Sequence, residues 1–234
     1  MNSTVPVISA TQLVLACVPT VIVIGIMVHW RTHAASALYA TARMLVQLIA
    51  IGYVLIYLFE TDNALIILGV LAIMLTVASW IAIRPLPRRN RQIYADALTA
   101  IACGSIPTLL LVTQGVIDVE PWFKPRYVIP LAGMIFAGAM NTVSLAAERY
   151  ESDYDAVNGP ERARRAAFEA SMIPHVNTLL AVGLVTLPGM MTGQVLSGVS
   201  PLVAAKYQIV VMTMLFGASG IAAAVYLVLR GRRP

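Results

Sequence analysis

Basic residues are distributed unevenly along this chain, in loops that alternate with long apolar segments. Twelve of the sixteen lysine and arginine residues lie in the stretches 29–36, 84–95, 148–175 and 230–234. Because positive charge resists transfer across a membrane, these four stretches are expected on the cytoplasmic side. No lysine or arginine precedes Arg31, so the N-terminus is expected outside and the C-terminus in the cytoplasm.

The composition indicates a lipid environment. Of the 234 residues, 59% are hydrophobic and 12% are charged, which leaves too few polar side chains to cover a water-soluble domain. A bilayer core about 30 Å thick needs roughly 20 apolar residues per helix. We therefore predict an all-α, polytopic helical membrane protein with about seven transmembrane helices in a single domain over residues 1–234. The expected helices are 7–28, 37–59, 64–83, 96–117, 127–147, 175–197 and 202–229.

The chain start and the net charge fit the same interpretation. No basic region precedes the first apolar segment, so we expect it to remain as a helix rather than to be cleaved as a signal peptide. The net charge of +5 is explained by arginines facing anionic inner-leaflet lipids, and no nucleic-acid partner is needed. Cys17 and Cys103 lie inside predicted helices, where small apolar packing is expected rather than a disulfide.

The motifs of common enzyme classes are missing from the sequence. The lysines, Lys124 and Lys206, are followed by Pro125 and Tyr207, so no Gly-Lys-Ser/Thr loop can hold ATP phosphates. His29 and His33 form an i, i+4 pair at the inner end of the first helix and are interpreted as interfacial polar residues rather than metal ligands. We expect a chain that catalyses no reaction itself.

Arg43 is a charge inside a predicted membrane segment, about seven residues into 37–59. Intramembrane charges commonly mark functional sites. Two interpretations remain open: the long side chain snorkels to the inner interface, or it acts inside the helix bundle together with Gln47, which shares its face at i+4.

Other polar residues of the predicted helices are placed near their ends or on one face. Asp96 opens the segment 96–117 and is expected to cap it, and Glu148 is expected to end the helix 127–147 at the cytosolic edge. Asn141, Thr142 and Ser144 are expected to join neighbouring helices by hydrogen bonds. Since no carboxylate is expected at mid-membrane, coupling to protons or sodium is not favoured.

The stretch 187–194 interrupts the predicted helix 175–197. Proline and glycine free backbone groups there, and in a membrane these must be satisfied by protein or by a water-lined cavity. The interruption is either a substrate path or hinge, or a packing kink. Its candidate path residues are Pro188, Gly189, Met190, Met191, Thr192 and Gln194.

The cytoplasmic stretch 148–175 is the longest loop. A break is expected at 153–160, followed by a helix over 161–173 that Pro174 ends or kinks. The helix is interpreted as a surface helix on inner headgroups or as a docking helix for a cytosolic partner. Small residues form one face and charged ones another: Ala163, Ala166, Ala167 and Ala170 against Arg162, Arg165 and Glu169.

Four motifs carry a resemblance to a known family. They are Arg43-Met-Leu-Val-Gln-Leu, Ser171-Met-Ile-Pro174, Gly183-Leu-Val-Thr-Leu-Pro-Gly-Met-Met-Thr-Gly-Gln194 and Lys206-Tyr-Gln-Ile-Val-Val-Met212. In this order they resemble the FetB-type permeases, the membrane subunits of a bacterial ABC exporter implicated in iron homeostasis, with plant relatives linked to aluminium tolerance.

The resemblance implies a homodimeric permease of the bacterial cytoplasmic (inner) membrane, with two copies of a separate ABC ATP-binding subunit at its cytoplasmic face. ATP and Mg²⁺ would then bind in that partner, with no cofactor in this chain. In the family a Glu-Ala…Leu-Gly-Ala segment precedes the Leu-Ile-Pro element, and here Glu151 and Asp155 to Gly159 stand in its place with shortened spacing. The candidates for coupling to the ATP-binding subunit are Glu151, Asp155, Gly159, Arg162, Ala166, Ala170 and Pro174. The candidates for the transport path are the residues of the interrupted helix named above, together with Arg43, Gln47, Asn141 and Glu148.

Two other classes of membrane protein share part of this sequence pattern. A retinal protein needs a lysine near the middle of the last helix and an acid in the third, but Lys206 lies near the start of 202–229 and 64–83 has no acid. A membrane anchor that recruits a cytosolic partner without transport is the second alternative. The substrate stays open among ferrous iron, another metal, a metal chelate and a lipid-like solute, because no cluster of hard ligands is visible in the helices.

Overall fold

The computed structural model describes residues 8–154 and 159–231, and in these the regular structure is helical. One isolated bridge, between Val182 and Thr186, joins extended backbone. The predicted all-α class is therefore confirmed.

Nine α-helices and one π-helical turn follow one another along the described chain. They are α1 (Ala10–Ala16), α2 (Val18–His29), α3 (Ala34–Phe59), α4 (Ala64–Ala82), α5 (Arg91–Leu110), η1 (Leu111–Val116), α6 (Pro125–Tyr154), α7 (Pro160–Ala181), α8 (Gly189–Leu196) and α9 (Pro201–Gly231).

The chain divides into two compact units, residues 1–60 and 61–234. In the first unit, α1 begins with a capping box in which Ser9 and Gln12 satisfy each other's backbone N–H groups. Large apolar side chains of α2 and α3 are widely exposed, among them Val21, Ile49 and Tyr57. Such surfaces suit contact with lipid.

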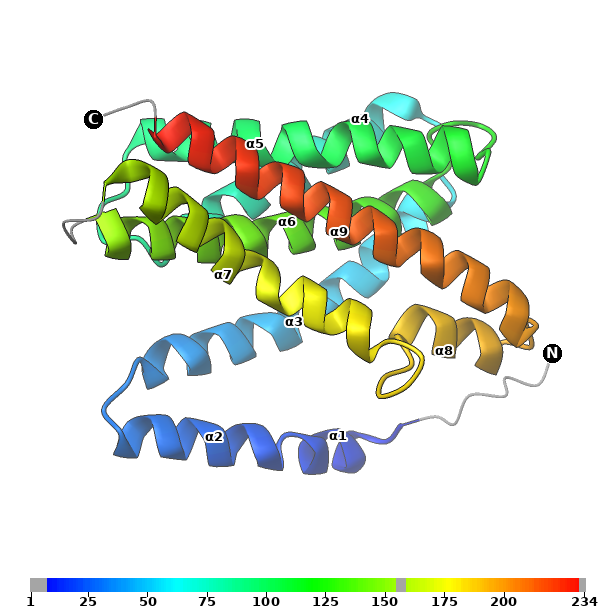
Figure 1. The fold of residues 1–234 in the computed structure, drawn as a ribbon. Helices are drawn as coiled ribbons and strands as arrows, with labels where there is room; N and C mark the ends of the chain where they lie inside the picture. Colours follow the sequence, from blue (N-terminus) through cyan, green and yellow to red (C-terminus); the bar gives the residue numbers. More distant parts are fainter. Residues whose placement is uncertain (1–7, 155–158, 232–234) are drawn as a thin grey trace. The chain divides into compact units, whose positions relative to one another are not determined.

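The second unit is a bundle in which α9 packs along α5 and α6, and α7 packs against α6 and α9 (Figure 1). The contact between α5 and α9 is made of small residues, since Ala97, Ala100, Ala218 and Ala222 are fully buried. Small residues let helix backbones approach closely, which is how helices associate in a membrane without a hydrophobic driving force.

Among the residues that the structure describes, six helical segments are long and apolar enough to cross a membrane: Ala10–His29, Ala34–Phe59, Ala64–Ala82, Arg91–Val116, Pro125–Tyr154 and Pro201–Gly231. The remaining predicted helix, 175–197, is not continuous. Its first part continues α7 to Ala181, and its last part is the short helix α8. The helix expected over 161–173 is the other half of α7, and Pro174 lies within α7 without ending it.

Two expected helix ends were wrong. Asn90, not Asp96, caps α5, through a 2.7 Å hydrogen bond from the Ile93 backbone N–H to its side chain. Asp96 lies further along α5 and is only 3% exposed. Glu148 does not end the fifth predicted helix, because α6 continues to Tyr154 and Asp153 pairs with Arg149 at 3.0 Å inside it.

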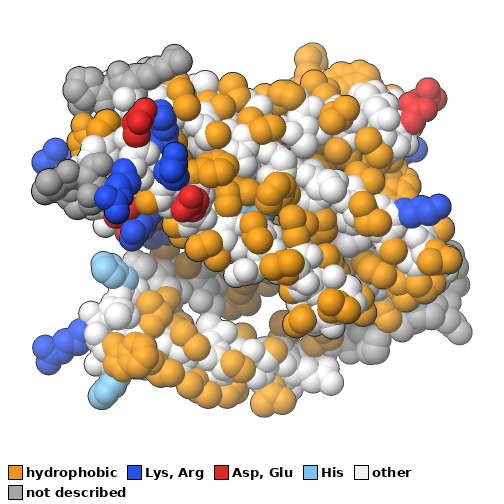
Figure 2. Space-filling model, in the orientation of Figure 1, with side chains coloured by type: hydrophobic (Ala, Val, Ile, Leu, Met, Phe, Trp, Pro, Cys, Tyr) orange, Lys and Arg blue, Asp and Glu red, His pale blue; other side chains and the backbone are white. Residues whose placement is uncertain are grey.

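The outer surface of the second unit is largely apolar, and lysine and arginine gather at the end where α7 begins (Figure 2). The C-terminus of α9 lies at the same end in Figure 1. The arginine-bearing stretches of this unit thus share one end of the bundle, which agrees with the pattern from which the topology was predicted.

Gly104 tests the close α5–α9 contact. A Cβ atom at this position would lie 2.8 Å from the backbone nitrogen of Ala222, so we expect Gly104→Ala to separate the helices and to lower the stability by about 1–3 kcal/mol. Thermal unfolding in detergent measures this loss. Gly69→Ala on α4 is the control, since nothing lies within 4 Å of its added Cβ; equal melting temperatures for both variants would contradict the packing described.

Candidate functional site: the open face of α6 and the interrupted helix

One face of α6 is uncovered along most of the helix and carries three polar residues. Arg126, Asn141 and Glu148 on it are exposed, and Met134 is half-buried. We call these four residues the open face of α6. An amide near the middle of a long apolar helix and a carboxylate nearer its end are costly against lipid. This face is therefore suited to a water-filled path or to another protein surface.

An interruption is present after α7, but it lies at 182–188, earlier than the predicted stretch 187–194, of which residues 189–194 are helical in α8. Gly183, at φ +84°, allows the backbone to turn, and its N–H donates to the carbonyl of Thr186 at 2.9 Å. The Thr192 hydroxyl donates to the carbonyl of Pro188 at 3.2 Å. The turn thus satisfies much of its backbone internally, as non-helical chain in a membrane protein must.

The tip of this turn is apolar and uncovered. Leu184 is 91% exposed and Val185 is 81% exposed. Since neither side chain packs on the described chain, the tip is suited to lipid or to a second protein surface.

A cavity of about 540 Å³ lies between α6, α8 and α9. Of the six path residues predicted at the interruption, Met190 and Gln194 line this cavity, whereas Pro188, Gly189, Met191 and Thr192 do not. Arg126 and Met134 line it from the open face of α6. The remaining lining residues are Ile117, Tyr127, Pro130, Leu131, Val199, Val203, Tyr207, Val210 and Val211.

A polar contact joins α6 to α7 inside the bundle, next to the open face. Thr142 Oγ1 lies 2.7 Å from Nε2 of His175 and also donates to the carbonyl of Gly138 at 2.9 Å. A hydroxyl has one proton to donate, so we assign Nε2 of His175 as the donor to Thr142. Nδ1 of His175 then carries a lone pair.

His175 was not among the predicted site residues. It stands at the first position of the predicted helix 175–197, and the signal that could have found it is an ionisable residue within an apolar segment. Thr142 was correctly expected to join helices, and its partner is His175.

Arg43 and Gln47 are brought together in the first unit. With the Gln47 amide oriented so that its oxygen faces the guanidinium, this oxygen accepts from Nε and Nη2 of Arg43 at 3.2 and 3.3 Å. Arg43 is half-buried and Gln47 is exposed. The shared face inferred from the i, i+4 spacing is therefore a direct contact.

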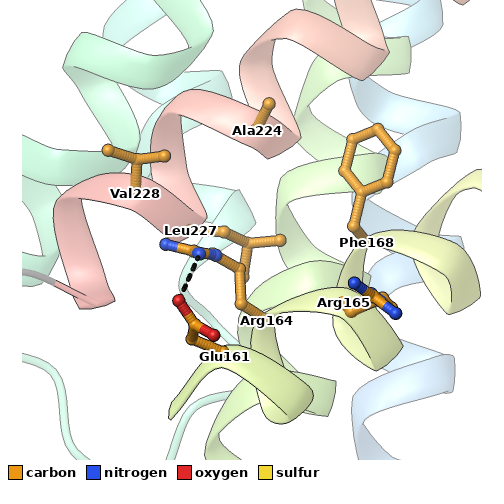
Figure 3. Close-up of a pocket in the computed structure, with 7 residues that line it drawn as sticks. All are labelled: Glu161, Arg164, Arg165, Phe168, Ala224, Leu227 and Val228. Atoms are coloured by element: carbon orange, nitrogen blue, oxygen red, sulfur yellow. Dashed lines mark ion pairs between the residues drawn. The ribbon is translucent and has the colours of Figure 1, made fainter.

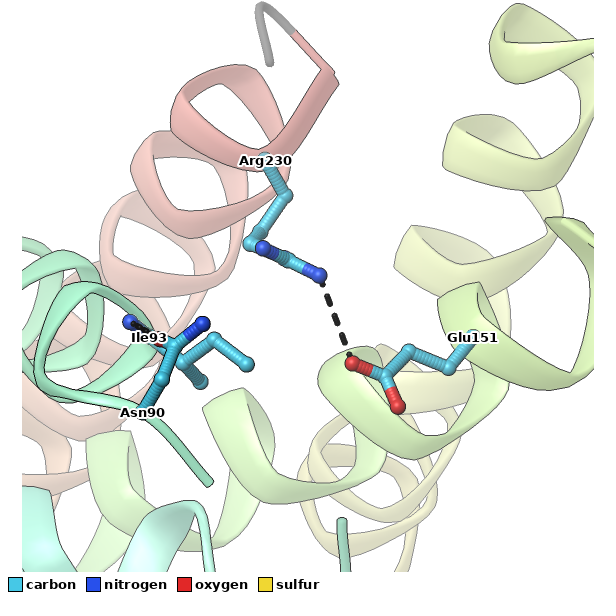
Figure 4. Close-up of polar contacts among 4 residues, drawn as sticks. All are labelled: Asn90, Ile93, Glu151 and Arg230. Atoms are coloured by element: carbon cyan, nitrogen blue, oxygen red, sulfur yellow. Dashed lines mark hydrogen bonds and ion pairs between the residues drawn. The ribbon is translucent and has the colours of Figure 1, made fainter. Parts of the chain in front are cut away.

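Charged groups meet at the arginine-bearing end of the second unit. Arg230 of α9 reaches Glu151 of α6 at 3.4 Å, beside the Asn90 cap of α5 (Figure 4). Both side chains of this pair are about three-quarters covered, so the pair fixes the end of α9 against α6. Glu151, a predicted coupling residue, thus has a structural contact here.

A groove of about 430 Å³ runs between the first turns of α7 and the last turns of α9 at this end. Phe168 and Arg165 project beside it, and Arg164 lies 3.9 Å from Glu161 (Figure 3). Phe168 is exposed. An exposed aromatic side chain flanked by arginines is typical of protein-binding surfaces.

The other coupling candidates are distributed over both sides of α7. Ala163 and Ala167 are buried in the bundle, while Ala166 and Ala170 are half-buried. Arg162 and Pro174 are exposed, and Gly159, at φ +76°, precedes the first turn. Asp155 lies outside the described residues. Only part of the predicted small-residue face is thus available to a partner.

The architecture defines a multi-pass helical membrane protein. A family model for an uncharacterised protein family, UPF0014, matches residues 10–233, and the chain belongs to this family. No solved structure matches the chain.

Three relatives illustrate the family. A UPF0014 membrane protein (slr1647) of Synechocystis sp. is 39% identical over 193 residues, which is 76% of this chain and 74% of the relative. The "Probable iron export permease protein FetB" of Escherichia coli is 32% identical over 88% of this chain and 85% of its own length. "Protein ALUMINUM SENSITIVE 3" of Arabidopsis thaliana is 34% identical over 78% of this chain and 71% of its own length. The family resemblance inferred from the motifs is confirmed.

The Thr142–His175 contact can be tested by removing one hydroxyl. Thr142→Val leaves a half-buried ring N–H without its acceptor, and we expect a loss of about 1–3 kcal/mol in stability. Thermal unfolding in detergent reports the change. Thr213→Val is the matched control, because that hydroxyl bonds only to carbonyls of its own helix; an equal loss in both variants would show that the contact between helices contributes nothing.

Proposed function

We propose that this chain is the membrane-spanning permease subunit of an ABC transporter that exports iron or another metal. ATP hydrolysis would take place in a separate ATP-binding subunit that holds ATP and Mg²⁺. The name of the E. coli relative supports a permease in iron export. The sequence itself offers no phosphate-binding loop, so transport against a gradient needs an energy source from another chain.

The observation that carries the proposal is the groove at the start of α7. This helix is not among the segments that could cross a membrane, and its first turns lie at the arginine-bearing end of the bundle. They present Phe168 beside Arg165 and the Arg164–Glu161 pair. An aromatic anchor with a positive rim fits a groove of opposite charge on a cytosolic partner.

A homodimer of this chain is part of the proposed transporter. The open face of α6 and the tip at Leu184 and Val185 are uncovered in the described chain. A second copy of the permease would shield Asn141, Glu148 and the tip from lipid and enclose a polar path between two copies of Asn141. The paired permeases would then offer two α7 grooves, one for each ATP-binding subunit.

The docking surface can be tested with two substitutions. Phe168→Ala removes the aromatic anchor and Arg165→Glu reverses a rim charge, so each is expected to weaken the complex roughly tenfold or more. The candidate partners are those ABC ATP-binding subunits of the source organism that have no membrane domain of their own. Co-purification of each candidate with the permease variants is measured, and so is ATP hydrolysis by the complex.

Arg88→Glu is the matched control for this experiment. Arg88 is exposed in the stretch between α4 and α5, so the variant changes the same charge away from the groove. If Phe168→Ala and Arg165→Glu both retain the partner, the docking proposal is contradicted. If the ATP-binding subunit docks but inverted vesicles show no metal transport, the alternative of a membrane anchor that recruits a cytosolic partner without transport would be favoured.

Arg43 offers a second test of transport. Lysine keeps the charge but cannot make the two-point contact that the guanidinium makes with Gln47. We therefore expect Arg43→Lys and Arg43→Gln both to lower coupled ATP hydrolysis roughly tenfold, equivalent to about 1.4 kcal/mol, at normal expression. Full activity of Arg43→Lys would show that the residue only snorkels, because both side chains reach the interface with one charge.

A further inference from the structure

The charged side chain that lines the cavity between α6, α8 and α9 in the described chain is positive. Arg126 lines it, and no acidic side chain does among the residues described. Arg126 also forms no ion pair with any residue in the described part of the chain. Asp118 and Glu120 are the acids nearest in sequence, and neither is part of the lining. The cavity therefore presents an unneutralised guanidinium.

Helix ends of both signs lie at this cavity, because η1 ends beside the lining residue Ile117 and contributes partial negative charge, whereas two long helices begin there. Both α6 and α9 begin at this end of the bundle, at Pro125 and Pro201, and the N-terminus of a helix carries a partial positive charge. These two helices are the longest of the described chain. A bare metal cation would meet the guanidinium and both positive helix ends with no carboxylate to offset them.

The rest of the lining is apolar or amphipathic. Met134 and Met190 contribute flexible thioether side chains, which adapt to apolar ligands of irregular shape. Valine side chains of α9 complete the wall. The volume of about 540 Å³ lies within the range of roughly 300–1,000 Å³ that is common for small-molecule sites.

The cavity is open at its side, near the end of the bundle where α6 begins. Tyr127 and Val203, which line it, are 42% and 44% exposed. Trp122 and Tyr127 lie just before and within the first turn of α6, as aromatic residues do at the headgroup level of a bilayer. A lipid molecule can therefore enter from the leaflet at this end without crossing the bundle.

We propose that this cavity binds an amphipathic anion of that leaflet, a lipid whose acidic head lies at Arg126 and whose apolar chain lies along Met134 and Met190. The guanidinium matches a carboxylate or phosphate head, and the apolar walls match an acyl chain. The inference does not depend on the proposed function, because binding can be measured on the permease without an ATP-binding subunit.

Photolabelling with two probes of opposite charge tests the site. The purified permease is placed in nanodiscs of phosphatidylcholine with a small fraction of a diazirine-bearing fatty acid, or of a diazirine-bearing alkylamine of equal chain length. After irradiation, mass spectrometry compares the peptides that contain Met134 and Met190. We expect the fatty acid to label them roughly tenfold more than the amine, since one favourable charge pair gives a ratio of this order.

Peptides from the exposed face of α4 serve as the reference for lipid that surrounds the protein, and both probes should label them equally. Arg126→Glu should abolish the preference for the fatty acid. Lys124→Glu, which changes the same charge two residues away outside the cavity lining, should keep it. Equal labelling by the two probes, or an unchanged preference in Arg126→Glu, would show surrounding lipid only and overturn the proposal.

Met134→Trp gives a second route if the arginine variant does not fold. The larger side chain narrows the cavity beside Met190 and leaves Arg126 in place, so labelling of the Met190 peptide should fall roughly tenfold. Undiminished labelling of this peptide would place the probe outside the cavity and overturn the proposal as well.

Discussion

Backbone hydrogen bonding in lipid governs how this chain can fold. Where the chain crosses the bilayer, each N–H and C=O must find a partner within the protein, and long helices meet this need. The turn at 182–188 departs from the helical pattern, and it meets the same need differently, with Gly183 bonded to Thr186 and the Thr192 hydroxyl on the carbonyl of Pro188. A non-helical turn built with its own hydrogen bonds is a designed feature of the fold rather than a local failure of it.

Apolar length and arginine position predicted the helices well, because both follow from the thickness and polarity of the bilayer. The expected segments 64–83 and 202–229 agree with α4 and α9 within a few residues. The segment 175–197 was predicted to be interrupted, but the interruption lies at 182–188 rather than at 187–194. Hydropathy measures how apolar a segment is and carries no information on whether its backbone turns back. Pro174 shows the converse, since a proline can remain inside a helix whose other contacts hold it.

Polar residues whose role depends on a distant partner were the least predictable part of the site. Asp96 had a sequence position suited to a helix cap, but Asn90 lies closer to the first free N–H groups and takes that role, so that Asp96 is buried in α5. His175 meets Thr142, 33 residues away in sequence, and no local pattern encodes such a pair. By contrast, the contact between Arg43 and Gln47 followed from helix periodicity alone, because residues at i and i+4 are neighbours on any helix.

The open face of α6 lies next to the polar contact that links α6 to α7. It carries Arg126 at one end, Asn141 near the middle and Glu148 toward the arginine-bearing end. The sign of the charge therefore changes along a single helix, with a neutral amide between. Next to the amide, Thr142 holds His175 of α7, and α7 continues without a break from that contact back to the groove at Phe168. A partner bound at the groove would therefore be connected through one helix to the polar contact inside the bundle and to the turn that follows α7.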